Sequence, residues 1–300
     1  MSKRASLACV LAALTALPAF AGEEAAWTEN AADAMAAAAK DGKDLLIDFT
    51  GSDWCGWCMR LDKEVFSQEA FTAAAPKSFV LLKLDFPRER PLSEATKKQN
   101  AEWQAKFRIS GYPTIVLADA AGRPYARTGY QEGGAEKYMQ HLVALRKIRV
   151  QRDEALAKAQ AAEGVEKAKL LDAALAPIDA SLVMGNYEDV VAEIVKLDAD
   201  NKAGLRNKYG AMSALVRIEA AARGKDLDGA IQLADDALKT YGDTGSAAQD
   251  ILFVKSLCFY RKSDKAQAKA LLEAALKAAP DGPKAEQIKM ILERMFKDIK

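Results

Sequence analysis

The chain has 300 residues and an almost even charge balance, with 43 Lys and Arg against 42 Asp and Glu. This balance gives no electrostatic case for binding nucleic acid or an anionic membrane surface, and the length predicts two domains. Four cysteines are too few for a fold held together by disulfides, so reactive cysteines are favoured over structural ones.

The segment 1–21 has the order of features that is typical of a secretory signal. Lys3 and Arg4 supply positive charge, residues 7–17 form a short apolar segment, and Ala19–Ala21 supplies a small-residue cleavage site. We therefore expect an exported protein, periplasmic or otherwise extracytoplasmic, that is cleaved after Ala21.

Residues 22–148 mix strand and helix signals. Strands are expected at residues 45–49, 79–86, 112–117 and 125–128, and helices after Cys55 and at residues 68–75, 93–107 and 136 to about 149. Ser93 is a candidate N-cap. Alternating strands and helices predict an α/β layer structure for this first domain.

Strand signals stop at about residue 150, and residues 149–300 are predicted to form an all-α domain. Apolar residues recur at helical spacing, and the Ala-Leu-Lys triplet at 237–239 occurs again at 275–277. This period favours a helical-repeat solenoid over the alternative, an ordinary helical bundle. The basic run at 146–152 is predicted to be a solvated helix face.

The segment Trp54-Cys55-Gly56-Trp57-Cys58 places two thiols three residues apart, directly after a predicted strand. A helix start favours the thiolate, which is the attacking species in disulfide exchange, and a second thiol within reach can resolve the mixed disulfide. A structural disulfide or a metal pair are the alternatives. The loop between the two cysteines is too small for a disulfide to stabilise the fold much, and no second Cys or His pair completes a metal site, so no metal is expected.

With these residues in place, the first domain resembles the thioredoxin superfamily. The resemblance is carried by Asp48-Phe49, the Cys55–Cys58 motif, Lys83-Leu84-Asp85 and Gly111-Tyr112-Pro113-Thr114. It implies an α/β thioredoxin fold. The helical extension resembles tetratricopeptide repeats.

The resemblance also implies a role for each matching residue. Cys55 would be the nucleophile and Cys58 the resolving thiol. Pro113 matches the family's cis-proline, beside which the Tyr112 backbone would meet a substrate chain.

Further residues would support the two thiols. Asp48 and Lys83 match the family's buried carboxylate and its lysine partner, which assist proton transfer at the resolving cysteine. Trp54, Gly56 and Trp57 surround the thiols, with Trp54 expected to pack inside and Trp57 to be exposed.

Three features depart from the family pattern. Seven positions separate Asp48 from Cys55, one more than is usual, and Trp57 replaces the usual proline of thioredoxin. The segment 87–103 is longer than the family's usual connection, which suggests an added element facing the substrate.

The sequence thus predicts an exported thiol–disulfide oxidoreductase, a reductase or isomerase, that needs no cofactor beyond its Cys55–Cys58 disulfide. Expected partners are protein disulfide substrates, a membrane-bound electron donor and possible protein ligands of the helical repeats, with no nucleic acid. Two alternatives remain open: a protein-binding repeat adaptor with an accessory redox domain, and a thiol peroxidase.

Overall fold

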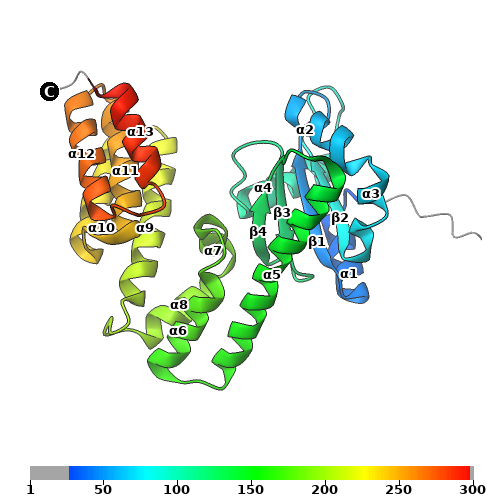
Figure 1. Ribbon diagram of the computed structural model, residues 1–300, viewed down its shortest axis with the longest axis horizontal. Coiled ribbons are helices and arrows are strands. Elements are labelled where there is room, and N and C mark those ends of the chain that lie inside the picture. The colour runs from blue at the N-terminus through cyan, green and yellow to red at the C-terminus, as the bar shows by residue number, and fades with distance from the viewer. Residues whose placement is uncertain (1–26, 298–300) are drawn as a thin grey trace, which may run out of the picture.

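The computed structural model describes residues 27–297, so the predicted signal segment lies outside the described residues. A four-stranded sheet has the order β2-β1-β3-β4 (Figure 1). Its strands are β1 (Asp44–Thr50), β2 (Phe79–Asp85), β3 (Thr114–Ala118) and β4 (Pro124–Thr128). β1 is parallel to β2 and antiparallel to β3, which is antiparallel to β4.

Helices cover both faces of this sheet. Alternate residues of a strand point to opposite faces, and every residue of β1 is buried, so neither face is open to solvent there. Leu45, Ile47 and Phe49 pack in one core, and Leu46 packs in another. The first core includes α1 (Ala31–Asp41) and residues at the end of α4 (Glu94–Lys106), which Ser93 caps as expected. The second includes α2 (Gly56–Leu61), a π-helical turn (Asp62–Phe66), α3 (Glu69–Thr72), a 3-10 turn (Ala75–Lys77) and the start of α5.

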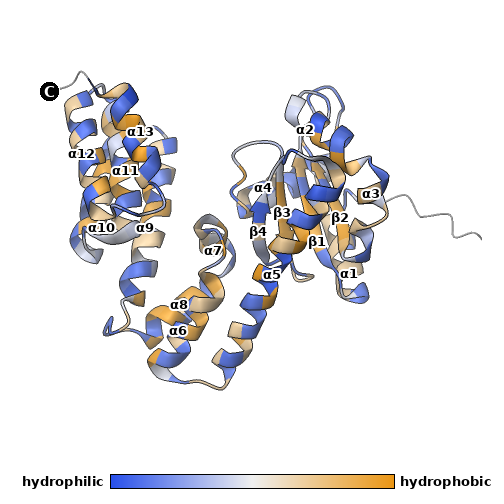
Figure 2. Ribbon diagram, in the orientation of Figure 1, coloured by the Kyte–Doolittle hydropathy of each residue, from blue (hydrophilic) through white to orange (hydrophobic). Residues whose placement is uncertain are grey.

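Nine helices follow the sheet in the described part of the chain. They are α5 (Gly134–Gln160), α6 (Gly164–Leu175), α7 (Ala180–Asn186), α8 (Glu188–Leu197), α9 (Leu205–Arg223), α10 (Leu227–Tyr241), α11 (Gly245–Arg261), α12 (Lys265–Ala278) and α13 (Ala285–Met295). Apolar residues gather where these helices face one another (Figure 2). Between residues 27 and 297, no helix is both long and apolar enough to cross a membrane.

The pairs α9–α10 and α11–α12 are joined by matching turns. Lys225 and Ser263 have positive φ angles of 67° and 66°. The next residues, Asp226 and Asp264, each cap the following helix by accepting a backbone N–H bond. The α/β fold followed by an all-α region is confirmed, while the assignment of the repeats to the tetratricopeptide type stays a prediction.

The helix α5 runs unbroken through residue 148, where the sequence suggested a domain boundary. The prediction that its basic run is a solvated face holds for Lys147, which is exposed, but is wrong for the three arginines. Arg146 and Arg149 pair with the fully buried carboxylate of Asp44, while Arg152 is itself buried and bonds to Asp119 and Tyr187. These guanidinium groups neutralise the carboxylates of Asp44, at the start of β1, and Asp119, just after β3. The charge pattern of residues 146–152 alone does not show that such partners exist.

The first core continues from the sheet into the helical region without a break. Leu182, Tyr187 and Ile194 belong to the same buried cluster as the α1 face of the sheet. The Tyr187 hydroxyl accepts a hydrogen bond from Arg152 and donates one to the carbonyl of Pro124 in β4. The start of the helical region is therefore packed onto the sheet rather than tethered to it.

Candidate active site

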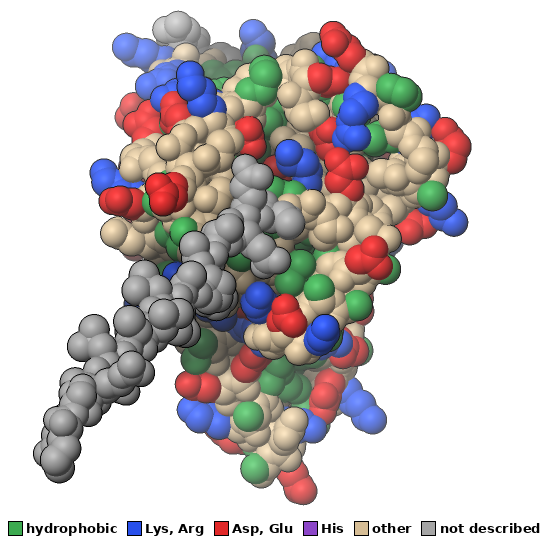
Figure 3. All heavy atoms as spheres, turned by 90° about the vertical axis from the view of Figure 1, so that its right-hand side faces the viewer, with side chains coloured by type: hydrophobic (Ala, Val, Ile, Leu, Met, Phe, Trp, Pro, Cys, Tyr) green, Lys and Arg blue, Asp and Glu red, His purple; other side chains and the backbone are tan. Residues whose placement is uncertain are grey.

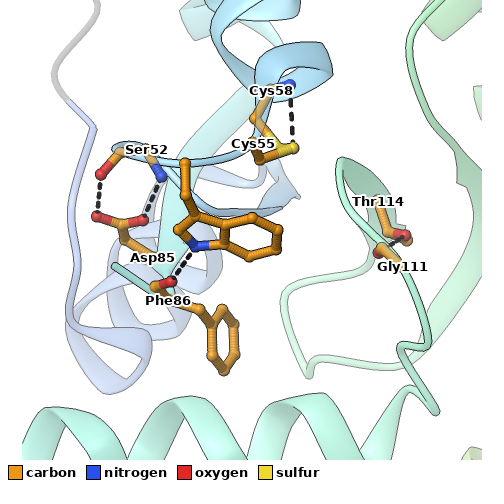
Figure 4. Close-up of a disulfide and its surroundings, with 8 residues drawn as sticks. Ser52, Cys55, Cys58, Asp85, Phe86, Gly111 and Thr114 are labelled. Atoms are coloured by element: carbon orange, nitrogen blue, oxygen red, sulfur yellow. Dashed lines mark hydrogen bonds between the residues drawn. A yellow bond between two sulfur atoms is a disulfide. The ribbon is translucent and has the colours of Figure 1, made fainter. Parts of the chain in front are cut away.

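The two cysteines of the motif form a disulfide at the first turn of α2 (Figure 4). Cys55 is the N-cap residue, and its Sγ accepts a hydrogen bond from the Cys58 backbone N–H at 3.2 Å. Both side chains are almost covered, at 6% exposed for Cys55 and 4% for Cys58. After reduction, the same N–H and the helix start would stabilise a thiolate on Cys55.

A tight turn brings the chain from β1 to Cys55. The Cys55 N–H donates to the carbonyl of Gly51 at 2.9 Å, and this turn accommodates the longer spacing after Asp48. The indole of Trp54 lies against Gly51, where a Cβ atom would come within 2.5 Å of the ring. The indole N–H donates to the carbonyl of Phe86 at 2.8 Å, so Trp54 anchors the turn to the end of β2.

On the other side of Cys55, Trp57 is 55% exposed and is held by a cluster of three residues. The Tyr130 ring lies 5.3 Å from the Trp57 ring, and the Arg60 guanidinium stacks 5.4 Å from Trp57 and 4.9 Å from Tyr130. Glu64 joins the two by accepting bonds from Arg60 and from the Tyr130 hydroxyl. The motif therefore presents a large, ordered apolar surface to solvent.

The segment predicted to meet the substrate packs against the cysteine turn. The Tyr112–Pro113 peptide bond is cis. The Tyr112 ring contacts Trp54 at 5.7 Å and Phe86 at 5.3 Å, and its hydroxyl accepts a bond from Gln104. The structure thus brings Tyr112, Trp54 and the disulfide into one aromatic-lined site.

Asp48 is buried on β1, directly opposite Lys83 in the β1–β2 register. Burial raises the pKa of Asp48 from 3.8 to about 7, and the positive charge of Lys83 only partly opposes this. One carboxylate oxygen of Asp48 has no hydrogen-bond partner. Among the described residues, Asp48 and Lys83 form no ion pair with each other. A carboxyl group with this pKa can gain or lose a proton near neutral pH.

Sequence reasoning missed the elements that hold the loop 87–92 beside the motif. The carboxylate of Asp53 accepts backbone N–H bonds from Arg88 and Glu89 at 2.9 and 2.7 Å, which lowers its pKa. Asp85 accepts bonds from the backbone and hydroxyl of Ser52 (Figure 4), and it also accepts one from Arg90. The available signal was an aspartate at the end of a strand, Asp85, and another in a turn, Asp53. Their partners Ser52 and Arg88 lie 33 and 35 residues away, so local spacing does not predict these bonds.

Comparison with known proteins places residues 26–120 in a family described as thioredoxin-like. The disulfide bond reductase DsbH of Chlamydia pneumoniae is 31% identical over 121 residues, which cover 40% of this chain and 73% of that protein. The thioredoxin-related protein DsbJ of the same organism is 34% identical over 85 residues, 28% of this chain and 24% of that protein.

A solved structure named DsbH oxidoreductase aligns with 46% of this chain and 95% of its own, at 28% identity and a TM-score of 0.41. The family assignment depends on the sequence matches, in which nearly three quarters of the DsbH relative is covered at more than 30% identity. The matched residues contain the Cys55–Cys58 pair, and so this chain belongs to the thioredoxin-like family of thiol–disulfide oxidoreductases.

Proposed function

We propose that the protein is an exported reductase or isomerase of disulfides in other proteins. The observation that carries this proposal is the Cys55–Cys58 disulfide at a helix start, flanked by the exposed Trp57 and the Tyr112–Pro113 segment. The relative named as a disulfide bond reductase supports the reducing direction. An exposed aromatic surface beside the thiols suits a polypeptide substrate better than a small oxidant.

In the proposed reaction the Cys55 thiolate attacks one sulfur of a client disulfide. A bond forms between Cys55 and that sulfur, while the other client sulfur leaves as a thiolate and takes up a proton. The Cys58 thiolate then attacks Cys55, restoring the Cys55–Cys58 disulfide and releasing the second client thiol. Two electrons pass to the client, and an external dithiol donor, for which we propose a membrane-bound protein, must reduce the enzyme again.

Asp48 is proposed to take the proton of Cys58 in the second step. The resolving thiol is buried, and so is the carboxyl group, whose pKa of about 7 matches that task near neutral pH. Lys83, on the neighbouring strand, keeps that pKa from rising further. These two residues would act through Cys58 rather than touch the client.

The direction of electron flow is tested by the reduction potential. The protein is equilibrated with glutathione redox buffers, and its redox state is read from the fluorescence of Trp54 and Trp57. The reduction potential should be roughly −180 mV or lower, the range of dithiol reductases and isomerases. Such a protein should also reduce insulin with dithiothreitol as the donor. A potential near roughly −120 mV, typical of strong oxidants, would contradict the proposal.

Export is proposed from the features of residues 1–21. If it is correct, the intact mass of the protein recovered from a periplasmic extract should correspond to a chain that begins at Gly22. Recovery of the uncleaved chain in the cytosolic fraction alone would contradict export. A cytosolic variant lacking residues 2–21 serves as the control for the fractionation.

A second candidate function is that the helical region acts as an adaptor. Two cavities of about 310 and 240 Å3 lie along α9 and α11 and share Leu215 and Asp250 as lining residues. The larger one also includes Arg108 from the end of α4 and Met212. Under this hypothesis a protein with Cys55→Ser would keep its biological role and its partners, whereas an oxidoreductase would lose both turnover and covalent clients.

A further inference from the structure

An arginine that forms no ion pair among the described residues is stacked on Trp54, the residue before the reactive disulfide. The Arg88 guanidinium stacks over the indole of Trp54, 4.1 Å from the ring centroid. Trp54 immediately precedes Cys55, and its ring also contacts Tyr112, the residue before Pro113. A client chain lying between Cys55 and Pro113 would therefore pass close to this guanidinium group.

The loop that carries Arg88 is fixed in place before any client arrives. Its backbone N–H groups at Arg88 and Glu89 donate to Asp53, and the indole of Trp54 is bonded to the carbonyl of Phe86. The cation–π contact then restricts the guanidinium itself. A preorganised group loses little conformational freedom when a ligand binds, which favours specific recognition over a loose surface charge.

The neighbouring arginines have carboxylate partners, whereas Arg88 has none among the described residues. Arg60, stacked on Trp57 within the same motif, pairs with Glu64 at 2.8 Å. Arg90 pairs with Asp85 and Glu29. The carboxylate of Asp53 faces the backbone of the loop, so the edge of the Arg88 guanidinium keeps its N–H donors free for an anion.

The wider surface does not supply this charge preference. Figure 3 shows acidic and basic side chains interspersed over the face that it displays, without a broad patch of one sign. Glu89 is exposed beside Arg88 and adds a negative charge of its own. A preference for an anion at this position would thus come from short-range contact with the Arg88 guanidinium.

We propose that Arg88 on Trp54 forms a subsite for an acidic side chain that lies next to the cystine in the client. A client Asp or Glu would accept paired N–H bonds from the guanidinium edge, while an apolar residue on the other side of the cystine would cover Trp57. The two sides of the disulfide thus differ in charge, and this difference fixes the direction in which the client chain lies. This inference rests on the proposed oxidoreductase function and adds a substrate preference to it.

The test uses two synthetic peptides that each contain one intramolecular disulfide. They are identical except that one has Glu, and the other Gln, beside the cysteine. The reduced protein is mixed with each peptide, and the second-order rate constant is followed by tryptophan fluorescence. We expect a preference for the Glu peptide of about fivefold at low ionic strength, which weakens in about 0.5 M salt because a partly exposed ion contact is screened.

The variant Arg88→Gln should react with the two peptides at one rate, and that rate should equal the wild-type rate with the Gln peptide. The matched control is Lys98→Gln, which removes the same charge from an exposed position on α4 and should keep the wild-type preference. Equal rates for both peptides in the wild-type protein would overturn the subsite alone. Slower reaction of Arg88→Gln with both peptides alike would also overturn it, since Arg88 would then act on the Cys55 thiolate.

Failure of the proposed function gives a different result. A wild-type dithiol that reacts with neither peptide would overturn both the oxidoreductase proposal and the subsite that depends on it. The rate with the Gln peptide also reports whether each variant is folded and active. The subsite is therefore judged from the ratio of the two rates, and the function from their absolute size.

Discussion

Replacing Cys55 with Ser should lower the rate of insulin reduction by about three orders of magnitude or more, because a hydroxyl cannot form the mixed disulfide. Replacing Cys58 with Ala should leave that first step intact and remove the second. Clients would then stay attached to Cys55 and should appear as higher-mass species on non-reducing gels that disappear with dithiothreitol.

Cys258 supplies the control for these two variants. It is a free cysteine, 1% exposed in the helical region, and burial raises its pKa, so it should take no part in exchange. We expect Cys258→Ala to keep wild-type turnover and to trap nothing. Trapped clients that persist when Cys55 and Cys58 are both replaced would contradict the assignment of the nucleophile.

The variant Asp48→Asn should be more stable than the wild-type protein above pH 7. The folded state raises the pKa of Asp48 from 3.8 to about 7, so folding favours its protonated form. Stability due to this group is present below about pH 4 and is lost as the pH rises towards and through 7. Because the pKa rises from 3.8 to about 7, the Asn variant should gain about 4 kcal/mol in free energy of unfolding at pH 8.

Urea denaturation of the oxidised protein at pH 4 and pH 8 measures this difference. The stabilising effect of Asp48→Asn should be large at pH 8 and close to zero at pH 4, while exposed Asp41→Asn should have little effect at either pH. If Asp48 also takes the proton of Cys58, the resolution of the mixed disulfide by Cys58 should slow in Asp48→Asn and lose its rise near pH 7. Equal stability of the variant and the wild-type protein at pH 8 would contradict a raised pKa.

Much of the redox domain could be predicted from its sequence because its signals are local. The apolar run around Ile47, the turn before it and the Ser93 cap each depend on neighbours close in the chain, and the strand and cap were found as expected. The two closely spaced thiols identified the disulfide in the same way. Strand, N-cap and CxxC signals of this kind depend little on which distant residues pack against them.

The parts that could not be predicted depend on residues distant in the chain. Asp53 holds the backbone of Arg88, and Glu64 bonds to Tyr130, so each pair is formed only after the sheet and its loops are in place. Arg152 was expected on a solvated face for the same reason, since its partners Asp119 and Tyr187 lie 33 and 35 residues away. A charged residue by itself does not indicate whether such a partner exists.

The long helix α5 begins on the sheet and ends in the helical region, with 27 residues in one unbroken rod about 40 Å long. Together with the buried packing around Tyr187, it forms a rigid connection rather than a flexible linker. A protein seated on the distal helices would consequently be held at a set distance and angle from the sulfur chemistry. A longer, flexible connection between the two halves would lower the effective concentration of such a protein at the disulfide, whereas a rigid connection would keep it high.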